Sequence, residues 1–140
     1  MKLIIYPLEN NKLGIIEPNP GLTMEQAISN MPNNMPTGIV DSKEIDYYFA
    51  EAYEFQNGKV NINIEKAKEI HINKFRIARA PLLLKLDTEF MKAVETGSKA
   101  LQKQIASKKQ ELRDITTVDL PNNLNEIKAV WPDILTNPFL

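Results

Sequence analysis

The apolar residues between positions 64 and 94 recur at helical spacing and predict the longest element of the chain. The first part of the pattern follows the capping residue Asn63 and consists of Ile64, Ala67, Ile70, Phe75, Ile77 and Ala78. The second part begins directly after Pro81 and consists of Leu82, Leu83, Leu86, Phe90, Ala93 and Val94. Proline lacks a backbone N–H and disfavours helical geometry at the residue before it. We therefore predict one helix kinked near Pro81, with a break into two helices at Ala80 as the alternative.

A reversal and a second helix follow. Gly97 stands where a left-handed helix cap favours glycine, and Ser98 can then cap the next helix. The second helix carries a narrow seam made of Leu101, Ile105, Lys108, Leu112 and Ile115. Because the connection is short, we expect an antiparallel hairpin in which Leu86 and Phe90 meet Leu101, Ile105 or Leu112.

The front of the chain has the alternation and turn residues of short strands. Lys2–Tyr6 and Lys12–Glu17 are rich in β-branched residues and predict a β-hairpin. Thr23 and Gln26 form a capping box that predicts a short helix. Residues 31–38 contain two prolines and a glycine, which indicates a connection without regular structure.

Five of the ten aromatic residues of the chain lie within nine positions, at Tyr47, Tyr48, Phe49, Tyr53 and Phe55. The Asn57-Gly58 pair after them is a strong hairpin signal, because a type I′ turn requires positive φ at both central residues. We predict strands near Glu51–Gln56 and Lys59–Ile62. The aromatic cluster could stack on bases or fill a partner's pocket, but we favour burial against the helices.

The C-terminal part is apolar and short. Leu124, Ile127, Val130 and Trp131 predict one amphipathic helix that ends at Pro132. The tail after it carries Ile134, Leu135, Phe139 and Leu140. We expect the tail to pack on its own domain, on a second copy of the chain or on a partner protein, since so many large apolar side chains near a chain end are otherwise exposed to water.

Together these patterns predict an α+β fold: a small N-terminal antiparallel β part with a short helix, then a long antiparallel helical hairpin and a short C-terminal helix. The corresponding regions are a small β-rich region at 1–63, the helical hairpin at 64–117, and the C-terminal short helix with its apolar tail at 118–140.

The charge of the chain is unevenly distributed. The net charge is −1, yet residues 64–117 hold 12 basic and 7 acidic side chains, a local charge of +5. Solvated lysines on two helices explain this excess more simply than a phosphate-binding surface does, because acidic residues are interspersed. The start of the chain lacks a signal-peptide pattern, and no apolar run approaches the roughly 18 residues of a membrane span. We therefore expect a cytosolic protein that does not enter a membrane.

Candidate chemistry is sparse. The chain has no cysteine and a single histidine, His71, so the sequence predicts no metal site. We also predict no cofactor and no catalytic residue, because the serines lack a nucleophile motif and a glycine-rich phosphate loop is missing. The sequence therefore predicts a protein that is not an enzyme.

A set of charged residues on the two hairpin helices predicts a structural network. Arginines beside carboxylates on facing helices can form bidentate pairs that fix the register of the hairpin. We favour this over a binding role for the set, which comprises Arg76, Arg79, Asp87, Glu95, Lys109, Arg113 and Asp114.

Several segments resemble a family of small tailed-phage and prophage proteins that are typically encoded beside tail-fibre genes. These segments are Ala67–His71, Arg76–Asp87, Ala93–Gly97, Lys108–Asp114 and Leu124–Pro132. The helical part is also similar in layout to the C-terminal region of tail-fibre assembly chaperones. The front half resembles the family only in the order of its elements, and Ser98 stands where the family pattern often has aspartate.

The resemblance implies a non-enzymatic protein that binds a phage tail or tail-fibre protein, as an assembly factor or as a minor virion component. Such a protein works in the bacterial host cytoplasm during assembly or stays in the virion tail. The candidate partner-binding residues are Tyr47, Tyr48, Phe49, Tyr53, Phe55, Trp131, Leu135 and Phe139. The alternative is a small prophage regulator that binds nucleic acid or a host protein through the basic hairpin, and homo-oligomerisation also remains open.

The charge distribution generates a first test. We expect duplex DNA to bind weakly and without sequence preference, because seven acidic residues dilute the positive charge of the hairpin and no recognition-helix pattern accompanies it. Fluorescence anisotropy with labelled duplexes at physiological salt measures this. Submicromolar, sequence-dependent binding would favour the regulator over the tail-associated protein.

Overall fold

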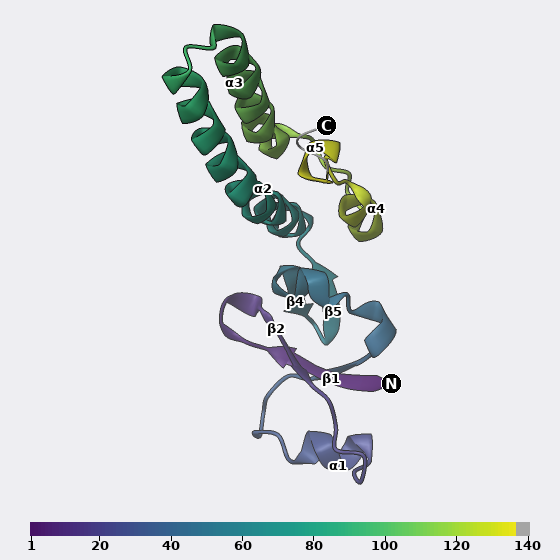
Figure 1. Cartoon of the computed structure of the whole chain (residues 1–140). Helices are drawn as coiled ribbons and strands as arrows, with labels where there is room; N and C mark the ends of the chain where they lie inside the picture. The colour runs from purple at the N-terminus through teal and green to yellow at the C-terminus, as the bar shows by residue number, and fades with distance from the viewer. Residues whose placement is uncertain (137–140) are drawn as a thin grey trace. The chain divides into compact units, whose positions relative to one another are not determined.

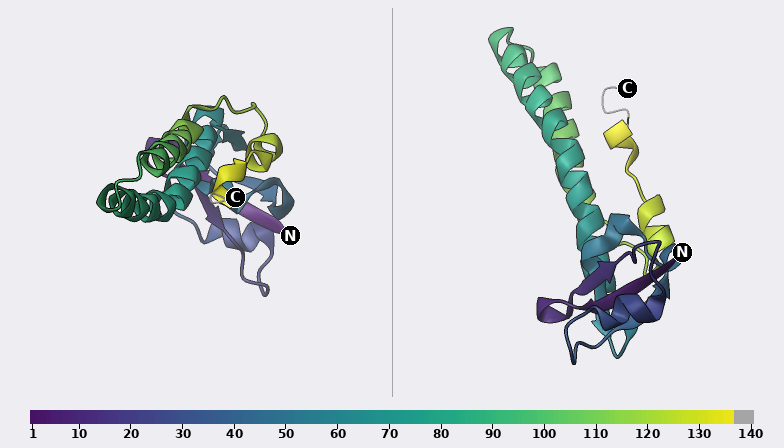
Figure 2. Two further views of the ribbon diagram at one scale, coloured as in Figure 1. Left: turned by 45° about the horizontal axis from the view of Figure 1, so that its top comes forward. Right: turned by 90° about the horizontal axis from the view of Figure 1, so that it is seen from below.

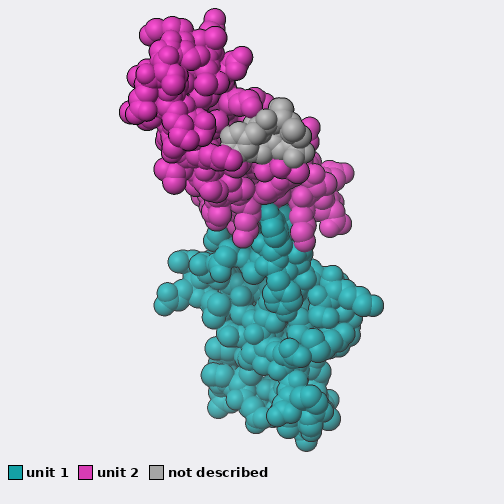
Figure 3. All heavy atoms as spheres, viewed as in Figure 1, with its two compact units in different colours: residues 1–67 teal, residues 68–140 magenta. Residues whose placement is uncertain are grey.

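The computed structural model describes residues 1–136 and confirms the α+β class (Figure 1). The chain divides into two compact units, Met1–Ala67 and Lys68–Leu140, which are coloured separately in Figure 3. Within residues 1–136, all the strands belong to the first unit, and the second contains most of the long helix together with the helices that follow it. The hairpin and the C-terminal segment therefore belong to one unit.

A three-stranded antiparallel sheet lies in the first unit. Its strands are β1 (Lys2–Pro7), β2 (Leu13–Ile16) and β3 (Gly38–Asp41), in the order β2-β1-β3. The predicted hairpin of β1 and β2 is confirmed, with Ile5 opposite Ile15 in the register. As the central strand, β1 has both of its faces covered, and Leu3, Ile4 and Ile5 are almost completely buried.

The second hairpin is also confirmed and pairs β4 (Tyr53–Gln56) with β5 (Lys59–Ile62). Asn57 and Gly58 have φ angles of 51° and 79°, as the predicted turn requires. The turn packs against the start of β3, where a Cβ on Gly38 would lie 2.0 Å from the carbonyl oxygen of Gly58. Only glycine at position 38 allows this close approach of two backbones.

The aromatic segment before β4 is helical, and this corrects the predicted strand start at Glu51. Residues Tyr47–Ala52 form a 3₁₀ helix, η3, and the strand begins at Tyr53. Asp46 initiates the helix, because its side chain accepts a hydrogen bond from the Tyr48 amide and its carbonyl accepts one from Phe49. The local capping group therefore overrides the strand preference of the aromatic residues.

Helix α1 (Met24–Ser29) lies on the opposite side of the three-stranded sheet from β4 and β5 (Figure 1). The predicted capping box is present: the Thr23 hydroxyl accepts from the Gln26 amide at 3.2 Å, and the Gln26 side chain accepts from the Thr23 amide at 2.9 Å.

The core of this unit is formed by Leu3, Ile4, Ile5, Val40, Ile45, Phe49, Ala52, Tyr53 and Phe55.

Helix α2 (Ile64–Glu95) runs through Pro81 without a break, so the prediction of a single helix is correct. Proline removes the amide that would bond to the carbonyl of Ile77. Ile77 is 69% exposed, which places that part of the helix beside water, where an unpaired carbonyl can be hydrated. This exposure explains how the helix tolerates the proline.

The reversal between the two long helices has the predicted caps. Gly97 has a φ of 70°, its amide donates to Val94, and the Ser98 amide donates to Ala93, a pattern known as the Schellman motif. Helix α3 (Lys99–Asp114) then begins, and the Ser98 hydroxyl accepts from the Leu101 amide at 3.3 Å. The two helices run side by side in opposite directions in both figures of the whole chain (Figures 1 and 2).

The contact between α2 and α3 is an apolar seam. Its buried members are Leu86, Ala93, Ile105 and Leu112, and Phe90 packs against them. This confirms the predicted meeting of Leu86 and Phe90 with the second helix. Leu101 is 42% exposed and lines a small cavity of about 180 Å³ at the edge of the seam.

The C-terminal segment contains two short helices, α4 (Leu124–Ala129) and α5 (Asp133–Thr136). The predicted continuation of the first helix to Trp131 is wrong. Val130 and Trp131 lie outside α4, because the residue before Pro132 is driven out of helical geometry. Asn123 caps α4 through its side chain, which accepts from the amides of Asn125 and Glu126.

The seam can be tested by burying a charge in it. Ile105→Asp should lower the free energy of unfolding by about 3 kcal/mol or more, because Ile105 is 5% exposed and its replacement would carry an unpaired carboxylate. Thermal unfolding followed by circular dichroism measures the effect. The matched control is Ala106→Asp, at an exposed position one residue further along α3, and equal melting temperatures for the two variants would contradict the seam.

Candidate functional site

The predicted aromatic residues of the first unit divide into buried and exposed members. Phe49, Tyr53 and Phe55 belong to the core, and the Tyr53 hydroxyl accepts a hydrogen bond from the Asp46 amide at 2.8 Å. Tyr48 packs edge-on against Phe49, and burial, together with the charge of Asp46, raises the pKa of its phenol. Tyr47 is 62% exposed. Of the five, Tyr47 alone offers most of its surface to a partner.

In the second unit, Trp131 belongs to an aromatic cluster. Its ring lies 5.4 Å from that of Phe75 and 6.3 Å from that of His71, in edge-to-face geometry. His71 is 1% exposed, and its Nε2 donates to the carbonyl of Val130 at 2.6 Å. This contact attaches the segment between α4 and α5 to α2, and it gives the histidine a packing role.

The described part of the apolar tail packs on the hairpin. Ile134 and Leu135 contact the seam cluster of Leu86, Ala93, Ile105 and Leu112. The described part of the tail therefore packs within its own unit, which is the first of the three expected outcomes. The candidate residue Phe139 lies outside the described residues.

The charged residues of the hairpin make contacts that differ from the expected arginine–carboxylate pairs. Arg79 Nη1 donates to the carbonyl oxygens of Leu112 and Arg113 at 3.2 and 3.0 Å. These carbonyls belong to the last turn of α3, where intrahelical partners run out. Arg79 thus fastens α2 to the C-terminal end of α3 and complements the helix dipole.

Among the other members of this set, one ion pair crosses between the helices, and Arg76 and Asp114 make contacts within their own helices. Lys109 forms an ion pair with Asp87 that joins the two helices. Arg76 donates to Asn73 one turn earlier in α2, and Gln110 donates to Asp114 within α3. Glu95 is the last residue of α2 and is exposed. Lys109 therefore provides the ionic link between the helices, while Arg79 binds backbone carbonyl oxygens.

One exposed apolar surface stands out on α2, and we call it the outer stripe. It consists of Ile77, Leu84 and Met91, which are 69%, 69% and 59% exposed, with Val94 at its end at 46%. The first three are seven residues apart and so share one side of the helix. Leu84 and Met91 each stand two residues before a seam residue, a rotation of about 200°, so the stripe faces away from α3.

The sequence analysis placed Ile77 and Val94 in one apolar pattern with Leu86 and Ala93 and did not separate the outer stripe from the seam. The signal was present, because Ile77, Leu84 and Met91 recur at heptad spacing beside the seam pattern. A helix with two apolar sides has no single amphipathic direction, and sequence spacing alone does not tell which side a neighbour covers. The structure resolves this by placing α3 against the side of Leu86 and Ala93.

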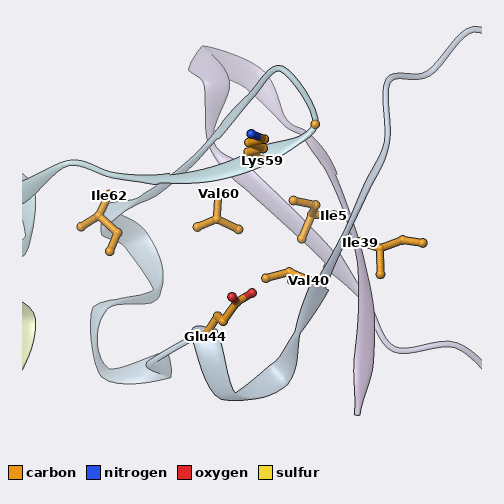
Figure 4. A pocket seen from close by; sticks show the side chains of 8 residues that line it. Ile5, Ile39, Val40, Glu44, Lys59, Val60 and Ile62 are labelled. Carbon is orange, nitrogen blue, oxygen red and sulfur yellow. The ribbon is translucent and has the colours of Figure 1, made fainter.

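The first unit has a pocket of about 360 Å³ between β3 and β5 (Figure 4). Figure 4 shows Val60 of β5 on one side and Val40 with Glu44 on the other. Glu44 Oε2 also accepts from the Asp41 amide at 3.3 Å, which ties this carboxylate to the end of β3. Glu44 and Lys59 both line the pocket and carry opposite charges, while the remaining side chains of the walls are apolar, so the pocket suits a small apolar group.

Asp41 itself completes a cap at the end of β3. Its carboxylate accepts from the Lys43 amide at 3.1 Å and lies 3.8 Å from both the N-terminal ammonium and Lys2 Nζ. The Lys43 hydrogen bond, supported by these cations, lowers the pKa of the Asp41 carboxyl. The cap therefore fixes the end of the strand.

Across residues 1–136, His, Asp and Glu side chains do not gather into a group that could hold a metal ion. None of the helices described combines the length and apolar character needed to cross a membrane.

No protein-family model, curated protein or solved structure matches the chain.

The docking of the tail generates a test of stability. Replacing both residues, Ile134→Ala with Leu135→Ala, should lower the free energy of unfolding by about 2 kcal/mol, because both side chains are half-buried against the seam. Chemical denaturation measures the change, and Thr136→Ala at the exposed end of α5 is the matched control. If the double variant unfolds at the same denaturant concentration as the control, the tail adds nothing to the stability of this unit.

Proposed function

We propose that the protein is a non-enzymatic, tail-associated phage or prophage protein that binds a tail or tail-fibre protein during assembly. The outer stripe is the observation that carries the proposal. Large apolar side chains exposed in a row on a soluble chain are costly, and such surfaces are typical of protein-binding sites. The resemblance of the helical segments to phage proteins encoded beside tail-fibre genes supplies the class of partner.

The arrangement of the hairpin suits this role. The seam, the Arg79 contacts and the Asp87–Lys109 ion pair hold α2 against α3 independently of any partner. The outer stripe is then presented on a preformed helix, so binding orders few further residues and loses little conformational entropy. A fibre-assembly factor of this kind would cover apolar fibre surface until the fibre subunits associate.

Tyr47 and Trp131 are candidates for additional contacts. They are 62% and 43% exposed, and aromatic side chains contribute strongly to protein interfaces. Tyr47 belongs to the first unit and Trp131 to the second.

The proposal predicts which side chains a partner needs. In co-expression with phage tail and tail-fibre proteins, Leu84→Gln combined with Met91→Gln should abolish co-purification. Losing two apolar contacts at the centre of an interface costs about 2 kcal/mol or more each. Both residues are exposed, so the melting temperature should change little.

The matched control is Ala106→Gln with Ser107→Gln, which adds the same residue type at exposed positions of α3. This control should retain the partner. Co-purification that survives in the Leu84/Met91 variant would contradict the role of the outer stripe, and a wild-type chain that captures no tail or tail-fibre protein would contradict the proposed function.

A further inference from the structure

The charged side chains beside the outer stripe point to the chemistry of the partner. Lys85 and Lys92 each follow a stripe residue by one position, so both lie along the same edge of the stripe. Lys74 lies about three turns before Lys85, on that edge as well, and both are exposed although each already has an interaction partner. Lys92 forms an ion pair with Glu89 at 3.5 Å, and its side chain is 65% exposed. Such an exposed pair within one helix is weak, so Lys92 can exchange it for a partner's carboxylate.

The opposite edge of the stripe has fewer basic residues than the lysine edge. Its acidic residue is already paired. Arg76 precedes Ile77 by one position, and Asp87 is held by Lys109 of α3. The exposed carboxylate of Glu95 stands at the C-terminal end of the stripe. The stripe is thus an apolar row bordered on one side by lysines.

We infer that the outer stripe binds an amphipathic helix of the partner whose apolar seam is flanked by carboxylates. This inference rests on the proposed function and specifies the partner surface. Residues at heptad spacing pack against a second helix, because both helices then keep their apolar rows in contact over several turns. Met91 lies fourteen residues beyond Ile77, about 21 Å along the axis, which is enough for about four turns of a partner helix.

A second copy of the chain fits the stripe less well. Antiparallel pairing about a two-fold axis would set the lysine edge of one copy beside the lysine edge of the other. Parallel pairing would set the lysine edge beside Arg76 and an Asp87 already bound to Lys109. With 12 basic and 7 acidic side chains in residues 64–117, two hairpins repel each other, whereas an acidic helix is attracted.

Two synthetic peptides of about four heptads test the inference with the full chain. Both carry isoleucine and leucine at the seam positions, and they differ in having glutamate or lysine at the flanking positions. We expect the glutamate peptide to bind at least about tenfold more tightly than the lysine peptide at low salt, and the difference to shrink as salt is added. Fluorescence anisotropy of the labelled peptides measures both affinities.

Charge reversal locates the effect on the stripe. Lys85→Glu with Lys92→Glu should weaken binding of the glutamate peptide about tenfold and strengthen binding of the lysine peptide. Lys99→Glu with Lys103→Glu, at exposed positions of α3, changes the net charge equally and should leave the preference intact. Circular dichroism confirms that each variant is folded before its binding is compared.

Three results would overturn the inference: equal binding of the two peptides, binding of neither, or self-association of the chain through the stripe in sedimentation experiments. The proposed function fails separately, because it depends on co-purification with a tail or tail-fibre protein and on Leu84 and Met91. The Leu84/Met91 variant could lose that partner while the wild-type chain binds both peptides equally. This result would support the proposed function and refute the inference that the partner surface is an acidic helix.

Discussion

The packing of α2 on α3 is the contact on which the rest of the second unit depends. Leu86, Ala93, Ile105 and Leu112 are all at most 5% exposed, and burial of this kind stabilises by roughly 1.5–3 kcal/mol for each large side chain. The tail packs on the same cluster through Ile134 and Leu135. The seam also decides which side of α2 faces water, so it creates the outer stripe.

Polar contacts at specific places set the register of this packing. Arg79 binds the carbonyl oxygens of Leu112 and Arg113 at one end of the hairpin, where α3 has backbone acceptors without helical partners. At the other end, the caps of Gly97 and Ser98 fix the reversal. Between them, Lys109 pairs with Asp87 and lies 5.7 Å above the ring of Phe90. These contacts hold α2 in one orientation, and a rigid helix is a suitable base for a binding surface.

Local sequence signals predicted the fold well wherever a single short-range interaction decides the structure. The Asn57-Gly58 turn, the Thr23 capping box and the Gly97 reversal all depend on a few neighbouring residues. Sequence reasoning failed where local signals compete, as at Tyr47–Ala52, where the Asp46 cap prevails over strand preference, and at Trp131, where Pro132 ends the helix early. It also missed the outer stripe, because the side of α2 that α3 covers is settled by tertiary packing. Of the candidate partner-binding residues, Phe49, Tyr53 and Phe55 are in the core, Phe49 from η3 and the other two from β4.

The central claim is that Leu84 lies at the centre of a surface that another protein covers. Site-specific photo-cross-linking tests it most directly, with a photoreactive amino acid at position 84 and, as the control, at the exposed position 106 of α3, in host cells that produce the phage tail proteins. The account predicts one dominant adduct with a tail or tail-fibre protein at position 84 and none at position 106. Absence of an adduct at position 84, or the same adducts at both positions, would contradict it.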